Sequence, residues 1–89
     1  MAKLRRKLSP EMEKEITTIF KKVELITALI FDIEDESLQG EFIEGFEPAK
    51  MKALHLKSEY DLQGYNEVTI QLLQEYKILM NRFQEDYEV

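Results

Sequence analysis

The chain has 89 residues, of which 44% are hydrophobic and 34% are charged, and its formal net charge at pH 7 is -6. This composition indicates one folded domain, because a disordered chain lacks the apolar surface that offsets its ordering entropy. The absence of cysteine excludes disulfides, thiolate metal sites and cysteine nucleophiles. An acidic chain is also a poor general binder of nucleic acid, since phosphate affinity depends on lysine and arginine.

Export and membrane insertion are not expected. The basic N-terminal residues are followed by Ser9, Pro10 and several acidic residues, where a signal peptide would have an apolar core. The longest apolar stretch, residues 25–31 interrupted by Thr27, is far shorter than the ~20 residues of a membrane-spanning helix. We therefore expect a soluble, cytoplasmic protein.

Residues 1–8 are predicted to form a flexible basic arm. It carries the candidate contacts to phosphate or to another anionic surface, which are Lys3, Arg5, Arg6 and Lys7. Four charges without a folded recognition element give weak, salt-sensitive binding. The arm therefore suggests an alternative function, a regulatory protein associated with nucleic acid.

The first helix is predicted over residues 9–37. Ser9 is suited to cap its N-terminus, and Pro10 suits the first helical position. Apolar residues then alternate in steps of four and three, which places them on one face. This seam consists of Met12, Ile16, Ile19, Val23, Ile26, Ile30 and Ile33. Acidic residues at the negative end of the helix dipole indicate an end near Ser37.

Further apolar residues of this helix lie outside the seam, where one neighbouring helix cannot cover them. They are Phe20, Leu25, Leu29 and Phe31. We expect these residues to mediate self-association. Two copies would then form a homodimeric four-helix bundle.

Residues 38–47 are predicted to be an acidic linker. From Asp32 to Glu47 the chain has seven acidic residues and no basic one. Apolar residues among these carboxylates suggest a surface for a partner protein. The candidate partner-binding residues are Phe42, Glu44, Phe46 and, as an exposed aromatic anchor, Tyr60. Because of the same negative charge, a further alternative is that the protein mimics nucleic acid and binds a basic partner.

The second helix is predicted over residues 48–87, with Pro48 at its first position. Its seam continues through Gly64 without a change of phase and consists of Met51, His55, Ser58, Leu62, Tyr65, Thr69, Leu72, Tyr76, Leu79 and Phe83. A glycine inside a helix costs only about 1 kcal/mol, so we favour one continuous helix. The predicted fold class is all-α, an antiparallel helical hairpin with a long second helix. The alternative is a three-helix bundle broken near Gly64.

No catalytic, cofactor-binding or metal-ligating set emerges. His55 is the only histidine, and one histidine cannot form a paired imidazole site. The acidic residues fall outside both seams, unlike the inward glutamates of di-iron bundles. The sequence therefore predicts a non-enzymatic protein without a cofactor. It would be a single helical domain over residues 9–89 that acts as a small adaptor, regulator or inhibitor by binding a partner protein.

Overall fold

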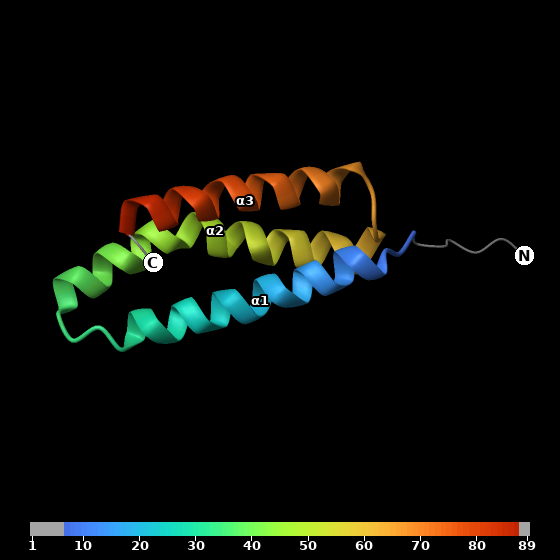
Figure 1. The fold of residues 1–89 in the computed structure, drawn as a ribbon. Helices are drawn as coiled ribbons and strands as arrows, with labels where there is room; N and C mark the ends of the chain where they lie inside the picture. The colour runs from blue at the N-terminus through green and yellow to red at the C-terminus, as the bar shows by residue number, and fades with distance from the viewer. Residues whose placement is uncertain (1–6, 88–89) are drawn as a thin grey trace, which may run out of the picture.

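The computed structural model describes residues 7–87, which form three α-helices and no strand. Helix α1 spans Pro10–Phe31, α2 spans Glu36–Gln63 and α3 spans Glu67–Tyr87. The helices run up, down and up along an elongated bundle (Figure 1). This arrangement confirms the predicted all-α class. None of the described helices is both long and apolar enough to cross a membrane.

Helix α1 begins as predicted but ends earlier. The Ser9 hydroxyl accepts a hydrogen bond from the Met12 N–H at 3.2 Å, and Pro10 lies in the first turn. The helical part of the predicted seam is buried and consists of Met12, Ile16, Ile19, Val23, Ile26 and Ile30. The end predicted near Ser37 is wrong, because α1 stops at Phe31.

Two side chains, Asp35 and Gln39, support the early start of α2 and the early end of α1. The Asp35 carboxylate accepts a hydrogen bond from the Leu38 N–H at 3.0 Å, which satisfies an orphan donor at the start of α2. The Gln39 amide then donates to the Ile30 carbonyl oxygen at 3.2 Å, at the end of α1. The linker predicted over residues 38–47 is therefore wrong, because these residues belong to α2.

The helix start predicted at Pro48 is also wrong, since this proline lies inside α2. An interior proline removes one hydrogen bond and costs about 3 kcal/mol. Phe46, which is 2% exposed, packs against Phe83 of α3 with ring centroids 5.0 Å apart. Burying an aromatic side chain of this size contributes ~1.5–3 kcal/mol. Packing against α3 thus offsets the cost of the proline.

The continuous second helix is wrong, and the alternative break near Gly64 is confirmed. Gly64 has φ 74° and ψ -156°, a conformation that favours glycine. Asn66 and Thr69 then cap α3 reciprocally. The Thr69 N–H donates to Asn66 Oδ1 at 2.9 Å, and the Asn66 N–H donates to Thr69 Oγ1 at 3.0 Å.

The buried face of α2 differs from the predicted one. Its buried residues are Phe46, Ala49, Ala53, Leu56 and Tyr60. The predicted positions in this helix are exposed, namely Met51, His55, Ser58 and Leu62. Both registers alternate in steps of three and four, and two alanines make the true one less conspicuous. In α3 the predicted seam holds at its buried positions, which are Thr69, Leu72, Tyr76 and Phe83.

Helix α2 is the central element of the bundle. Both α1 and α3 pack against it, whereas no Cα atom of α1 lies within 8 Å of a Cα atom of α3. Ala49 and Ala53 are 1% and 0% exposed, so small side chains form part of the central contact. The side of the bundle between α1 and α3 is consequently more open.

Candidate functional site

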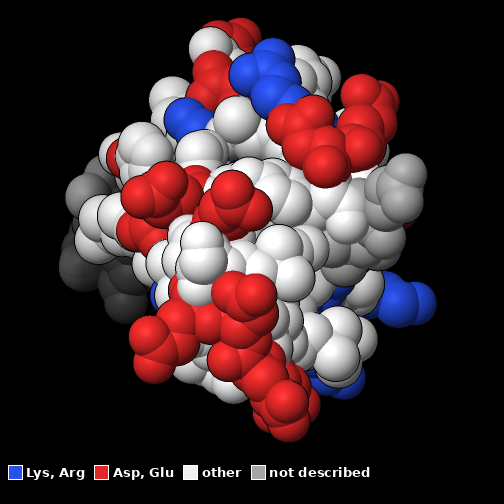
Figure 2. Space-filling model, turned by 90° about the vertical axis from the view of Figure 1, so that its left-hand side faces the viewer, with Lys and Arg blue, Asp and Glu red and all other residues white. Residues whose placement is uncertain are grey.

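One end of the bundle, where α1 is joined to α2, combines carboxylates with exposed apolar side chains. We call it the acidic end. Its exposed carboxylates belong to Asp32, Glu34, Asp35, Glu36, Glu41, Glu44 and Glu47. Its apolar side chains are 40% to 66% exposed and belong to Leu25, Leu29, Phe31, Leu38 and Ile43. Figure 2 views this end, where groups of carboxylates surround uncharged surface.

Two hollows flank α1 at the acidic end. The first has a volume of about 220 Å³ and is lined by apolar residues, and we call it the apolar hollow. It is lined by Ile26, Leu29, Ile30, Ile33, Phe42 and Phe83. The second hollow has about 60 Å³ and lies between α1 and α2, beside Phe31 and Ile43. Apolar concavities within a charged rim are typical of sites that receive an apolar side chain.

The four predicted self-association residues lie on two flanks of α1. Leu29 lines the apolar hollow on the α3 side, whereas Phe31 lines the second hollow on the α2 side. Phe20 is half-buried and lines a groove between α1 and α2. Leu25 is 60% exposed. The four do not form one continuous face, and self-association stays a prediction.

The four predicted partner-binding residues differ in their exposure in the structure. Glu44 is exposed, and the half-buried Phe42 lines the apolar hollow. Phe46 and Tyr60 are buried, at 2% and 4% exposure. The expectation of an exposed Tyr60 is wrong, because its hydroxyl donates to the Ser9 carbonyl oxygen at 3.1 Å and accepts from the Ser9 N–H at 3.0 Å.

Most of the predicted basic arm, with Lys3, Arg5 and Arg6, lies outside the described residues. Lys7 is exposed, and its amine lies 5.8 Å from the centroid of the Tyr65 ring. Its carbonyl oxygen accepts a hydrogen bond from the Tyr65 N–H. Lys7 is therefore held at the end of the bundle opposite the acidic end (Figure 1).

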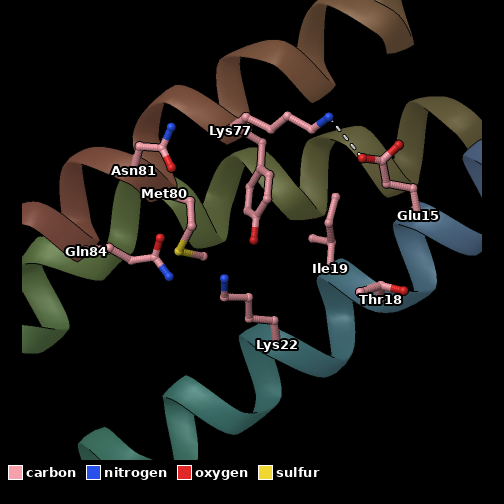
Figure 3. Close-up of a pocket in the computed structure, with 9 residues that line it drawn as sticks. Glu15, Thr18, Ile19, Lys22, Lys77, Met80, Asn81 and Gln84 are labelled. Atoms are coloured by element: carbon pink, nitrogen blue, oxygen red, sulfur yellow. Dashed lines mark ion pairs between the residues drawn. The ribbon is translucent and has the colours of Figure 1, made fainter. Parts of the chain in front are cut away.

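A groove of about 280 Å³ lies between α1 and α3 (Figure 3). It is lined by Glu15, Thr18, Ile19 and Lys22 of α1 and by Tyr76, Lys77, Met80, Asn81 and Gln84 of α3. The Lys77 amine forms an ion pair with Glu15 at 3.0 Å, which joins the two helices. In Figure 3 the Lys22 amine and the Gln84 amide extend into the space between the helices.

Tyr76 contributes an unusual group to this groove. The residue is 4% exposed, and its buried hydroxyl has no hydrogen-bond partner within residues 7–87. Burial raises the pKa of this phenol to about 12, because the low-dielectric surroundings disfavour the phenolate. A buried donor without a partner costs about 1–3 kcal/mol. Tyr76, which lines this groove, therefore has an unused hydrogen-bond donor.

Among the described residues, the surface around His55, the single histidine, shows no group of side chains suited to bind a metal ion. His55 is exposed and forms no hydrogen bond with Glu59, one turn later. Nearby, Lys52 joins α2 to α3 through an ion pair with Glu75 at 2.8 Å, and this contact lowers the pKa of the Glu75 carboxyl. Within the described part of the chain, no three His, Asp or Glu side chains are grouped to hold a metal ion.

Sequence reasoning missed the groove between α1 and α3. Lys22 and Lys77 are ordinary charged positions in the sequence, and Tyr76 is one of several seam residues. Only the packing of three helices brings them together. No family model, curated protein or solved structure matches the chain.

Proposed function

We propose that this protein is a non-enzymatic interaction module, a small acidic adaptor, regulator or inhibitor, that binds a partner protein at its acidic end. One observation carries the proposal. Exposed apolar side chains, including Leu29 and Phe31 at 52% and 66% exposure, lie beside the most acidic part of the chain, residues 32–47. Apolar surface in a charged setting is a common feature of protein-binding sites.

The chemistry of the acidic end defines the partner. The apolar hollow of about 220 Å³ has room for one or two apolar side chains, and the residues that line it are all apolar. The exposed carboxylates of the acidic end attract cations and repel anionic surfaces. The proposed partner therefore presents an amphipathic helix in which apolar anchors are flanked by lysine or arginine.

A second copy of the chain fits the acidic end less well. Two such ends facing each other would place like charges in contact, which costs free energy unless counterions intervene. The homodimer expected from the sequence is therefore a separate proposal. Light scattering at micromolar concentration tests the homodimer. A compact monomer would contradict it. A dimer that is lost in Leu29→Gln would mean that a second copy of the chain, and not a partner protein, binds at the acidic end.

The test of the proposal combines capture with matched variants. Proteins retained by the intact chain from its native extract are identified, purified and titrated by calorimetry. We expect Leu29→Gln and Glu44→Gln each to weaken binding about tenfold or more. Leu62→Gln is the control, since Leu62 is 71% exposed and lies at the opposite end of α2.

Two results would contradict the proposal. One is a purified partner that binds the Leu29 and Glu44 variants as tightly as the unchanged chain. The other is binding that disappears when residues 1–8 are removed and that falls steeply with added salt, which would favour nucleic-acid association through the basic arm.

A further inference from the structure

The groove between α1 and α3 has the chemistry of a ligand site rather than of a packing defect. Its charged groups are Glu15, Lys22 and Lys77. Glu15 and Lys77 neutralise each other through their ion pair at 3.0 Å. Among the described residues, Lys22 has no carboxylate within ion-pair distance, so the groove carries one uncompensated positive charge in an acidic protein.

Neutral donors surround this charge. The Gln84 amide extends towards the same space as the Lys22 amine (Figure 3). Tyr76 lines the same groove, and its hydroxyl is buried without a partner among the described residues. A buried phenol is a strong donor to an anion, because charge-assisted O–H···O⁻ bonds are short and about twice as strong as neutral ones. Amine, amide and phenol together suit one carboxylate group.

Other residues that line the groove indicate that the remainder of the ligand is apolar. Ile19 and Met80 are apolar and buried, at 6% and 4% exposure. Met80 is flexible enough to adapt to an inserted chain. The volume of about 280 Å³ is below that of a drug-sized pocket, so the ligand is small.

From these observations we infer that the groove between α1 and α3 binds a small organic carboxylate with an apolar body. Lys22 and Gln84 hold the carboxylate, and displacement of the Lys22 or Met80 side chain gives it access to the Tyr76 hydroxyl. Ile19 and Met80 contact the apolar body. This site is independent of the acidic end and does not rest on the proposed partner.

The experiment is a titration of the isotope-labelled protein with hexanoate, followed by ¹H–¹⁵N NMR spectra. We expect saturable shifts in residues 15–22 and 76–84. Hexanamide, which has the same apolar body without the charge, should bind about tenfold more weakly, and inorganic phosphate should not reproduce the pattern. Lys22→Gln and Tyr76→Phe should each weaken hexanoate binding about tenfold. Lys14→Gln is the matched control, because Lys14 is an exposed α1 lysine outside the groove.

Several results would overturn the inference. Shifts that do not saturate, or equal binding of hexanoate and hexanamide, would exclude a carboxylate site. Equal losses in Lys22→Gln and Lys14→Gln would indicate a general charge effect. Phosphate binding as tight as that of hexanoate would indicate an unselective anion site. Binding of a glutamate-containing peptide but not of the free carboxylate would make the groove a protein-docking site instead.

Discussion

The Gly64 end of the bundle is held by a set of side-chain hydrogen bonds to the backbone, whereas the acidic end combines exposed apolar side chains with a run of carboxylates. Tyr60 bonds both backbone groups of Ser9, and Asn66 and Thr69 cap α3 reciprocally. At the acidic end five apolar side chains are 40% or more exposed. The Gly64 end therefore has the character of a structural clamp, and the acidic end that of a surface available for binding.

The difference has an energetic basis. A buried polar group costs free energy unless it has a partner, so a closed turn such as the Gly64 turn must supply every hydrogen bond. An exposed leucine costs little in the unbound protein and becomes favourable only when another surface covers it. Substitutions at the Gly64 end should therefore change stability, and substitutions at the acidic end should change binding.

The largest expected effect contrasts two glycines. Gly64→Ala should lower the free energy of unfolding by about 1–3 kcal/mol, because φ 74° with ψ -156° is strained for a residue with a Cβ atom. Gly40→Ala should raise it by about 0.5–1 kcal/mol, since Gly40 lies in α2 and an added Cβ meets no atom within 4 Å. Urea unfolding followed by circular dichroism measures both. A change in the free energy of unfolding of the same sign in both variants would contradict this contrast between the two glycines.

The next effect contrasts two buried tyrosines. Tyr60→Phe should destabilise the fold by about 1–2 kcal/mol, because it leaves the Ser9 N–H and carbonyl oxygen without their partner. Tyr76→Phe should be neutral or stabilising by up to about 1 kcal/mol, since the hydroxyl that it removes has no partner in the described structure. The same unfolding measurement applies. A Tyr76→Phe variant as unstable as Tyr60→Phe would show that the Tyr76 hydroxyl is satisfied in solution.

These residues also show how far the sequence predicts the structure. The Ser9 cap and the seam of α1 follow from local rules, because caps and periodic apolar positions act within a few residues. The boundary between α1 and α2 does not follow from local rules. Pro48 resembles a helix start, whereas the Asp35 cap and the burial of Phe46 against α3 support the helical conformation of residues 36–47.

The candidate surfaces were predictable to different degrees. The acidic run and the excess of apolar residues in α1 are visible in the sequence, and the run lies at the acidic end together with Leu25, Leu29 and Phe31 but not Phe20. The side of α1 on which each residue lies is not visible, because it depends on where α2 and α3 pack. The groove near Tyr76 could not be predicted, since the lack of a partner for a hydroxyl is a property of three-dimensional packing.

A smaller effect should appear in alkaline solution. Burial raises the pKa of the Tyr76 phenol from its ordinary value of about 10 to about 12. Below pH 10 both folded and unfolded chains keep this proton, so Tyr76 adds no pH dependence there. Between pH 10 and 12 the unfolded chain loses the proton first, and stability should fall with rising pH by less than about 1.4 kcal/mol per unit. In this range the free energy of unfolding of Tyr76→Phe should fall less steeply with pH than that of the unchanged protein. Parallel plots of unfolding free energy against pH for the two proteins would contradict a raised pKa of Tyr76.

The smallest effect on stability is expected at the acidic end, where Leu29→Gln should change the free energy of unfolding by less than about 1 kcal/mol. Leu29 is 52% exposed, so much of its side chain already contacts water in the folded state. Val23→Ala in the same helix is the matched comparison, because Val23 is 6% exposed and its truncation should cost more than the Leu29 change. If Leu29→Gln proved as destabilising as Val23→Ala, Leu29 would be part of the core in solution. The apolar hollow would then be closed, and the acidic end would no longer offer the anchor site on which partner binding depends.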